Sequence, residues 1–582
     1  MERRESEMAA GRSFLVLRVV VPLLFIFAVG CSSKETKPSQ PPAPPGALAS
    51  ARKSTSSVPK ESKASVPKAS KTAATDVNLG KTRYQQHCAG CHGERGDGAG
   101  LAARFLFPKP RDFRAGRFRL VSTANAQPTL DDIQAVLVRG MPGSAMPPWL
   151  KLTDGDRSAL AQYVIELRRQ GIRDREKASA AENGEEFDAK AVEALVKQMT
   201  APGVPIPAPA IAASTAESVA RGKERFLKVC AACHGATGKG DGQEKMIDAE
   251  GWPDRPRDLT RGIFKGSPDP QSVYRRIFGG MPGTPMPASK WTPEQVVDVV
   301  HFVLSLSDEA ARKTAVLNRE RITAAFIDRQ LDSLEAAAWD RAPPARIHTM
   351  PLWWRDGPPV DIDVRALHNS RALAVRLSWP DPSANRHAAK VEAFGDAAAV
   401  ALSHGPSEPF LGMGSPSEPV DFWFWDADRQ SGLPDVDDVN PRLTVDIYPF
   451  GERAVETAEY QRPGTTADAQ AQPGLPARAV GNPRSAGKNS PIGTALEAAG
   501  PGTLTFRPRI NQTVQAQGSW HDGRWTVTFV GPLTTATGPA ASLKGGDTIS
   551  VSFAVWDGSH HDRDGQKRIT IWQDLVLEPS GR

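Results

Sequence analysis

The chain has 582 residues, which is too long for one hydrophobic core and predicts roughly three or four domains at about 150 residues each. Its 50 glycines and 50 prolines, with only 7% aromatic residues, indicate compact domains joined by long linkers and loops. The net charge of +6 comes from 72 basic and 66 acidic residues that are dispersed along the chain, and this excludes the concentrated basic surface of a nucleic-acid-binding protein.

Residues 1–30 predict an export signal. A basic start with Arg3, Arg4 and Arg12 is followed by an apolar run, Val19–Val29, that matches the core of a signal peptide better than a membrane span, which needs about 20 apolar residues. The segment Ala28–Cys31 resembles the bacterial lipoprotein box, in which the signal is cut before Cys31 and the thiol is acylated. A plain cleaved signal, or an uncleaved anchor that starts near Phe14, is the alternative.

A lipid on Cys31 would tether the protein to a membrane surface while its domains stay in water. Residues 31–76 are rich in Lys, Ser, Pro and Ala, which predicts a disordered tether. We therefore expect the folded domains on the periplasmic side of a bacterial membrane.

Four of the five cysteines fall in two Cys-x-x-Cys-His units, so no pair remains for a structural disulfide. Two thiols three positions apart on a helical turn can reach both vinyl groups of one haem, and the adjacent histidine then lies beneath the iron. A redox dithiol expects a βαβ pattern and a zinc site needs two further ligands, and neither context is present. We expect one covalent haem c on Cys88 and Cys91 with His92 on iron, and a second on Cys230 and Cys233 with His234 on iron.

The segments around these units are duplicates of each other. In each copy a Gly-Lys pair stands eight residues before the first cysteine, and a Gly-Asp-Gly turn follows the histidine. A Met-Pro-Gly-x-x-Met-Pro segment then precedes an amphipathic helix, predicted at 154–168 and 293–306. The repeat predicts two modules, at 77–172 and 217–308. The linker at 173–216, with one short helix at 188–198, is expected to let them move independently.

Both modules resemble small class I cytochrome c domains, in which a distal methionine usually precedes a proline shortly before the closing helix. A thioether is a soft sixth ligand that favours ferrous iron. The resemblance implies Met146 and Met286 as the distal ligands. Met141 and Met281 also precede proline and are the competing candidates.

A second repeated motif pairs arginine with aspartate, at Arg111-Asp112 and Arg257-Asp258. The arginines could pair with haem propionates, because a guanidinium offers a planar fork to carboxylates. The alternative is a solvated turn.

After the second module the pattern changes. Residues 309–332 are predicted to form a helical connector. From about Ile347, short alternating segments bounded by Gly, Pro and Asp predict a mainly β domain over 333–580, a sandwich or barrel. The predicted strands are 360–367, 372–379, 420–425, 443–447, 525–529, 548–556 and 568–577. Residues 453–489 are expected to be a mobile insert.

The motifs of this last domain follow the order seen in the ethylbenzene-dehydrogenase-type haem-b domain. They include Val375–Trp379, Trp423–Trp425 and Phe553–Gly558. That domain is similar to the γ subunit of periplasmic molybdenum enzymes of the dimethyl-sulfoxide-reductase family. The resemblance implies a non-covalent haem b between a methionine and a lysine, for which Met413 and Lys567 are the matching residues. Lys544 and Lys390 are the reserve lysines.

Together these features predict a multihaem electron-transfer protein that relays electrons between a molybdenum-type oxidoreductase and a respiratory partner. Molybdopterin and iron–sulfur subunits are the partners that the resemblance implies. A dihaem peroxidase-like enzyme is one alternative, although such an enzyme needs an open iron position and each module has its own methionine. The other is a dihaem cytochrome whose last domain is a docking module without haem.

Overall fold

The computed structural model describes residues 71–580, apart from 244–245, 332–334, 355–359, 370, 387–392, 404, 406–407, 432–491 and 534–542. The predicted export signal, Cys31 and the tether up to residue 70 lie outside these described residues. The predicted strand at 443–447, the insert at 453–489 and Lys390 also lie outside them. Within the described part of the chain, no helix combines the length and the apolar character that a membrane crossing requires.

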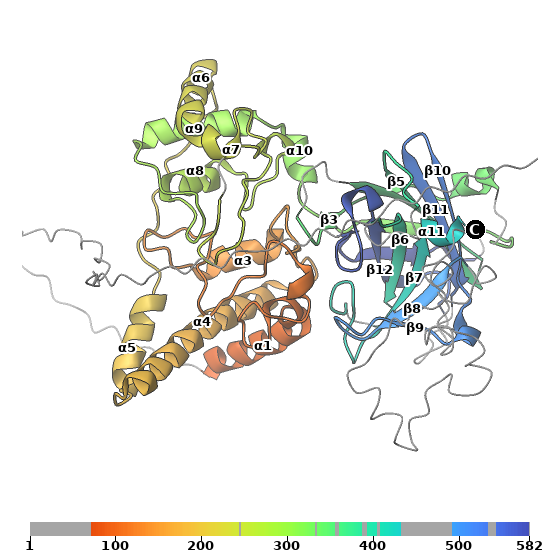
Figure 1. The fold of residues 1–582 in the computed structure, drawn as a ribbon, viewed down its shortest axis with the longest axis horizontal. Helices are drawn as coiled ribbons and strands as arrows, with labels where there is room; N and C mark the ends of the chain where they lie inside the picture. The colour runs from red at the N-terminus through yellow and green to blue at the C-terminus, as the bar shows by residue number, and fades with distance from the viewer. Residues whose placement is uncertain are drawn as a thin grey trace, which may run out of the picture. The chain divides into compact units, whose positions relative to one another are not determined.

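The first module is helical (Figure 1). Its elements are α1 (Lys71–His87), α2 (Ala89–His92), the 3-10 turn η1 (Ala103–Phe105), α3 (Leu130–Arg139) and α4 (Asp154–Asn183). Capping boxes start the last two helices: Thr129 pairs with Asp132, and Thr153 pairs with Asp156. These short-range bonds fix where each helix begins.

The second module repeats this arrangement. Its elements are α6 (Ala216–Arg225), the π-helical turn η2 (Phe226–Cys230), α7 (Ala231–His234), the 3-10 turn η3 (Leu259–Arg261), α8 (Pro270–Gly279) and α9 (Pro293–Ser305). The closing helix α9 again begins with a capping box, between Thr292 and Gln295. Its buried face carries valines and Phe302, which pack against Phe226 and the rest of the module's core.

The repeated glycine before each haem unit marks the crossing of two helices. A Cβ atom on Gly80 would lie 2.1 Å from the Ala159 carbonyl oxygen of α4. A Cβ atom on Gly222 would lie 2.0 Å from the Asp298 carbonyl oxygen of α9. Only glycine lets the first and last helices of each module approach this closely, which is why the duplication retains it.

The linker between the modules is ordered where we predicted flexibility. Helix α4 continues to Asn183 instead of ending near 168, and α5 (Ala189–Thr200) matches the predicted short helix. The Pro-rich stretch that follows is held against the first module: Ala124 N donates to Val204 O at 2.9 Å, and Ile206 N donates to Ser122 O at 2.8 Å. The expectation of independent movement is therefore wrong for this stretch, because its non-proline residues supply backbone bonds.

The last domain is built on one open sheet whose two halves pack on each other as a sandwich. Its strands are β1 (Arg321–Phe326), β2 (Ala345–His348), β3 (Met350–Pro351), β4 (Asp361–His368), β5 (Ala372–Pro380), β6 (Ala397–Ser403), β7 (Val420–Asp426), β8 (Thr494–Ala498), β9 (Thr505–Phe506), β10 (Gln515–His521), β11 (Arg524–Pro532), β12 (Thr548–Trp556), β13 (Arg568–Ile569) and β14 (Gln573–Leu577). The main order is β10-β11-β5-β4-β1-β14-β12-β6-β7-β8-β9. The fold class is thus the predicted sandwich. The predicted strands within the described residues occur, except that the one at 568–577 is divided into β13 and β14.

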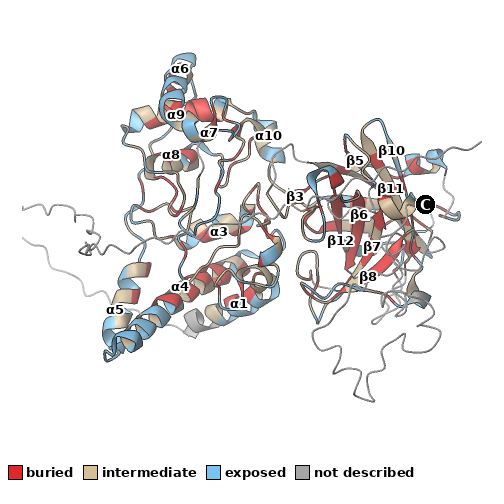
Figure 2. Cartoon of the chain, in the orientation of Figure 1, coloured by how far each residue is buried: buried red, intermediate tan, exposed pale blue. Residues whose placement is uncertain are grey.

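Tryptophan rings fill the space between the two halves, and glycines leave room for them. The ring of Trp425 on β7 lies 4.9 Å from that of Trp525 on β11. A Cβ atom on Gly531 would lie 2.4 Å from the Trp423 ring, so the indole fits because glycine has no side chain at this position. Figure 2 shows buried residues along the strands of this domain. Four tryptophans therefore make this core dense, as Trp379 is also fully buried.

The prediction of a helical connector at 309–332 is wrong beyond Thr314. Only α10 (Glu309–Thr314) is α-helical there, and Arg321–Phe326 forms β1. This strand lies parallel to both β14 and β4, with Ile322 opposite Leu575. Pairing in the centre of the sheet outweighs the weak local helix pattern, because a central strand satisfies its backbone bonds on both sides. A second short helix, the 3-10 segment η4, spans Ala336–Arg341.

The helix crossing yields a stability prediction. We expect Gly80→Ala to lower the free energy of unfolding by about 1–3 kcal/mol, because its Cβ must push α1 away from α4. Gly155→Ala is the control, since its Cβ would meet only the Thr153 hydroxyl, at 3.7 Å, and should be neutral or stabilising by up to about 1 kcal/mol. Urea unfolding followed by circular dichroism measures both, and equal effects of the two variants would contradict the crossing.

Candidate functional site

The first Cys-x-x-Cys-His unit forms a tight helical turn at the end of α1. His92 N donates to Cys88 O at 2.8 Å, and Cys91 N donates to the same oxygen at 3.1 Å. No disulfide joins the four described cysteines. Burial raises the pKa of Cys88 and of Cys91 to about 12, so both thiols are protonated at neutral pH. Paired, enclosed thiols next to a histidine fit covalent haem attachment.

His92 is held in the orientation that an iron ligand needs. Its Nδ1 lies 2.9 Å from the Arg111 carbonyl oxygen and donates to it, which leaves Nε2 with a free lone pair. The Phe113 ring stacks on the imidazole at 4.5 Å. Burial lowers the pKa of His92 to about 4, so the ring is neutral. The repeated Arg-Asp motif thus supplies a backbone carbonyl to the histidine, a role that the sequence did not indicate.

His234 in the second module differs in this respect. Its pKa is also lowered to about 4 by burial, but its Nδ1 is buried and has no hydrogen-bond partner among the described residues. The two histidines share their sequence context, whereas only the first has a carbonyl that fixes its tautomer. The two modules are therefore not equivalent in their proximal surroundings.

The two candidate methionines of each module lie on one loop. Met141 N donates to Met146 O at 2.9 Å, and Met281 N donates to Met286 O at 3.0 Å. The loop folds back on Gly140, where φ is 69° and a Cβ would lie 2.7 Å from the Met146 carbonyl oxygen. Met146 and Met286 both pack against their module's core, and Met141 and Met146 both border the cavity described next. The choice of Met146 and Met286 stays a prediction.

A cavity of about 990 Å³ extends from the first module into the β domain. This is near the upper end of the roughly 300–1,000 Å³ that cofactor and ligand pockets occupy. Its lining includes the first haem unit and both residues that we proposed for the β domain: Cys88, Cys91, His92, Met141, Met146, Met413 and Lys567. The structure thus brings the two sets of predicted residues to one cavity.

Small side chains make room for this cavity on the β domain. Ala397, Ala399 and Ala401 of β6 line it, whereas the alternate residues Ala398 and Val400 point into the sandwich core. All seven residues of β6 are buried. A row of alanines has low β-propensity, so we did not predict this strand. Its composition is explained by the space that it leaves open.

Lys567 and Met413 approach the cavity from two turns. Leu352 N donates to Lys567 O at 3.0 Å, and the Lys567 ammonium lies 4.5 Å from the centre of the Trp556 ring. Burial lowers the pKa of Lys567 to about 8, although Asp564 acts in the opposite direction. Met413 lies in a turn closed by its N–H bond to Phe410 O at 3.3 Å. Lys544, the reserve lysine, is exposed and does not line the cavity.

Family comparisons divide the chain in the same way. Residues 75–164 match the family described as cytochrome C oxidase, cbb3-type, subunit III, and residues 219–307 match cytochrome c. Residues 336–568 match ethylbenzene dehydrogenase. The chain is a tandem cytochrome c with an ethylbenzene dehydrogenase-family domain. Cytochrome c domains carry covalent haem, and we call the three parts cytochrome domain 1, cytochrome domain 2 and the ethylbenzene dehydrogenase domain.

Three curated relatives are similar to parts of this tandem cytochrome. One is a Haloferax mediterranei protein provisionally named respiratory nitrate reductase heme subunit ORF7, 27% identical over 37% of this chain and 55% of its own length. Another is dimethylsulfide dehydrogenase subunit gamma of Rhodovulum sulfidophilum, which is 24% identical over 40% of this chain and 70% of its own length. The third is chlorate reductase subunit gamma of Ideonella dechloratans, which is 25% identical over 41% of this chain and 78% of its own length. The chain thus spans about half of the first relative.

Cytochrome domain 1 is joined to the ethylbenzene dehydrogenase domain through its haem unit. A Cβ atom on Gly90 would lie 2.6 Å from the Phe410 ring, so Phe410 packs directly on the Cys88–His92 turn. Phe107 N also donates to Leu352 O at 3.0 Å. In cytochrome domain 2 the residue equivalent to Gly90 is Ala232. The difference between Gly90 and Ala232 was the only sequence signal for this contact.

A buried ion cluster joins cytochrome domains 1 and 2. Arg119 pairs with Asp248 at 2.6 Å and with Asp254 at 3.5 Å, and Lys265 pairs with Asp254 at 3.0 Å. Arg257 donates through Nε to Pro142 O at 3.1 Å, and its guanidinium lies 4.0 Å from the centre of the Trp354 ring. The domains are therefore docked on charges taken out of water.

The repeated arginines and aspartates have separate positions in this junction. Arg111 pairs with Glu250 at 2.7 Å, and both Arg111 and Arg257 border the cavity. Asp112 and Asp258 accept backbone N–H bonds within their own turns. The aspartates thus fit the turn interpretation, and the arginines remain candidates for propionate contacts. Sequence reasoning missed Arg119, which also lines the cavity and whose Nε is buried without a partner among the described atoms.

The ion cluster generates a second prediction. Arg119→Met keeps the apolar stem but leaves Asp248 and Asp254 short of a cation, so we expect the free energy of unfolding to fall by about 3–5 kcal/mol. The control is Lys313→Met, which breaks an exposed pair with Glu309 and should cause no measurable change. Urea unfolding measures both variants at constant ionic strength. A loss of unfolding free energy in Arg119→Met that is no larger than in Lys313→Met would contradict the buried cluster.

Proposed function

We propose that this protein is an electron-transfer subunit that holds two haems c and one haem b. The single observation that carries the proposal is the cavity shared by the Cys88–His92 unit and the Met413 and Lys567 side chains. When bound, each haem supplies a one-electron couple, and the protein contributes ligation, orientation and surroundings. The chain makes no substrate bonds in this proposal.

The residues divide the binding task in a consistent way. Cys88 and Cys91, and Cys230 and Cys233, would carry the thioether bonds, and His92 and His234 would serve as proximal iron ligands. Met146 and Met286 would be the distal ligands. Each thiol pair stands directly before its histidine, and each methionine packs against its domain core.

Met413 and Lys567 would hold a non-covalent haem b. A lysine binds iron only as the neutral amine, and the surroundings of Lys567 already favour that form by lowering its pKa to about 8. The alanines of β6 supply a flat, apolar wall, and Phe422 and Phe424 of β7 add to it. These properties support a planar apolar cofactor better than a purely polar ligand.

The contacts also suggest an order. Cytochrome domain 1 touches the ethylbenzene dehydrogenase domain through Gly90 and Phe410, and it touches cytochrome domain 2 through Arg119 and Asp254. Cytochrome domain 2 also touches the ethylbenzene dehydrogenase domain, through Arg257 and Trp354, but its Cys230, Cys233 and His234 do not line the shared cavity, whereas the haem unit of cytochrome domain 1 does. Cytochrome domain 1 would therefore be the middle station of the relay. Short, packed contacts on both sides keep neighbouring cofactors at fixed separations.

The partner and the location extend the proposal further. The names of two relatives, dimethylsulfide dehydrogenase subunit gamma and chlorate reductase subunit gamma, support assembly with an oxidoreductase. We infer a molybdenum-containing enzyme with molybdopterin and iron–sulfur subunits, and a respiratory partner at the other end. The N-terminal pattern supports the periplasmic side of a membrane, with a lipid on Cys31 as the anchor.

Extraction of haem tests the third cofactor. Acid acetone removes non-covalent haem and leaves thioether-bound haem, so the wild type should yield one extractable haem b and retain two haems c. Met413→Ala and Lys567→Ala should lose the extractable haem, because each removes an iron ligand. Ala399→Leu should lose it by filling the cavity.

Lys544→Ala is the matched control, since Lys544 is exposed and lies away from the cavity. Pyridine haemochrome spectra count both haem types in every variant. A wild type that contains only haem c would overturn the haem-b part and leave a dihaem cytochrome with a docking domain. Loss of haem b from Lys544→Ala instead of Lys567→Ala would overturn the assignment of the ligand.

Gly90→Ala tests the contact between the first two stations. The substitution turns Cys-Ala-Gly-Cys-His into the Cys-Ala-Ala-Cys-His of cytochrome domain 2, so covalent attachment should be unchanged. The added Cβ would overlap the Phe410 ring, so we expect slower electron transfer between haems c and b in flash-photolysis experiments. Ala232→Gly, the reverse change in cytochrome domain 2, is the control. A wild-type transfer rate in Gly90→Ala would contradict the relay order.

A further inference from the structure

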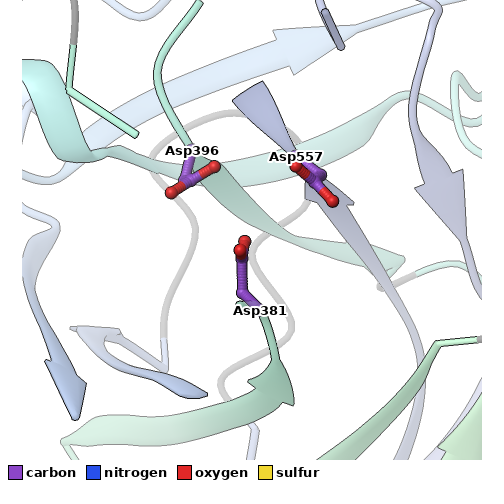
Figure 3. A group of neighbouring side chains, drawn as sticks. All are labelled: Asp381, Asp396 and Asp557. Atoms are coloured by element: carbon purple, nitrogen blue, oxygen red, sulfur yellow. The ribbon is translucent and has the colours of Figure 1, made fainter. Parts of the chain in front are cut away.

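Three aspartates meet inside the ethylbenzene dehydrogenase domain, away from the cysteines and methionines discussed above. Asp381 directly follows β5, Asp396 directly precedes β6, and Asp557 directly follows β12. One carboxylate oxygen of each lies within 4.8 Å of the others. Figure 3 shows the three carboxylates pointing toward a common centre. Strand ends far apart in the sequence thus bring three negative charges together.

Two of the three aspartates are enclosed, which makes their charge costly, whereas the side chain of Asp557 is 25% exposed. Asp381 is 1% exposed and Asp396 is 0% exposed. Burial, and then the neighbouring carboxylates, raise the pKa of Asp381 to about 8, and burial raises that of Asp396 to about 6. Buried carboxylates at this separation need a neutralising proton or a cation, because water no longer screens their repulsion.

Two of the aspartates are fixed by donors from the protein. Asp396 accepts from Asn385 N at 2.6 Å, from Gly558 N at 2.8 Å and from the Trp525 indole at 2.9 Å. Asp557 accepts from Ser559 and from the His560 imidazole, whose Nδ1 lies 2.7 Å away. These bonds fix the positions of the two carboxylates.

Asp381 supplies the observation that points to a ligand. Its Oδ1 accepts from Ser383 N at 3.1 Å, but its Oδ2 is buried and has no hydrogen-bond partner among the described residues. The carboxylate is directed at Asp396 and Asp557 (Figure 3). A buried acceptor without a donor is rare in native proteins, and this one is directed at two other acceptors.

We propose that Asp381, Asp396 and Asp557 bind a divalent cation, with Ca²⁺ as the ion that their chemistry selects. The three ligand groups are carboxylates only, which are hard oxygen donors that Ca²⁺ and Mg²⁺ prefer, whereas zinc favours nitrogen and sulfur. Mg²⁺ demands a near-ideal octahedral shell, whereas Ca²⁺ accepts irregular carboxylate geometry. A dication would offset two of the three negative charges that the cluster carries when all its carboxyl groups are ionised.

The cation would brace loops that also form the wall of the large cavity. Phe394 and Gly395, next to Asp396, line that cavity, and so do Asp562 and Asp564 in the turn that follows Asp557. The same turn leads to Lys567. Calcium bound at the strand ends would therefore hold the lysine-bearing turn in place. This consequence for haem b rests on the proposed function, whereas calcium binding itself does not.

The test uses the full chain, stripped of metal with a chelator and titrated with Ca²⁺ alone. Calorimetry should give one tight Ca²⁺ per wild-type chain, and thermal unfolding should shift to higher temperature with Ca²⁺. Asp381→Asn should lose both responses. It should also fold, because asparagine has the shape of a protonated aspartate and its amide can donate to the other two carboxylates.

Asp522→Asn is the matched control, since it removes one carboxylate from an exposed turn of the same domain and asparagine tolerates the positive φ of 48° found there. It should bind Ca²⁺ like the wild type. No calcium response in the wild type would overturn the proposal and assign a proton to the cluster. Unchanged binding by Asp381→Asn would overturn it as well. The haem count, measured separately, reports on the proposed function, so the two failures are distinguishable.

Discussion

The structure depends on keeping a cavity of about 990 Å³ open inside a protein whose interiors normally pack without voids. Where β6 borders the cavity, its side chains are alanines. Tryptophans pack on the opposite face of the same half of the sheet, inside the sandwich core. The cavity also reaches the first Cys-x-x-Cys-His unit. Met413, Lys567 and the haem unit of cytochrome domain 1 all border this space.

Desolvation governs the chemistry of the groups around this space. His92 stays neutral, the thiols stay protonated, and Lys567 is shifted toward its neutral form, in each case because burial disfavours the charged species. The same effect makes the cluster of Arg119, Asp254 and Lys265 rigid, since breaking a buried pair leaves an uncompensated charge. One physical effect thus sets the charge states of the candidate ligands and strengthens the contact between cytochrome domains 1 and 2.

The two copies of the duplicated module share the features that their fold requires and differ in their surroundings. The helix-crossing glycines, the capping boxes and the methionine loops are the same in both copies, because each is required for the fold. The copies differ where they touch other parts of the chain. Gly90 makes space for Phe410, and the carbonyl of Arg111 reaches His92, while His234 has no equivalent partner among the described residues.

The sequence by itself determined the two Cys-x-x-Cys-His units, the repeat, the sandwich class and the candidates Met413 and Lys567, because each depends on local spacing or on a motif. It did not determine β1, because that strand is stabilised by its pairing with β14 and β4. It did not determine β6 either, because the alanines of that strand are explained only by the cavity that they border. The ordered linker, the Gly90–Phe410 contact, the Arg119 cluster and the three aspartates were decided only by tertiary structure. Their partners are distant in the chain, and burial, which sets their charge states, has no local signature.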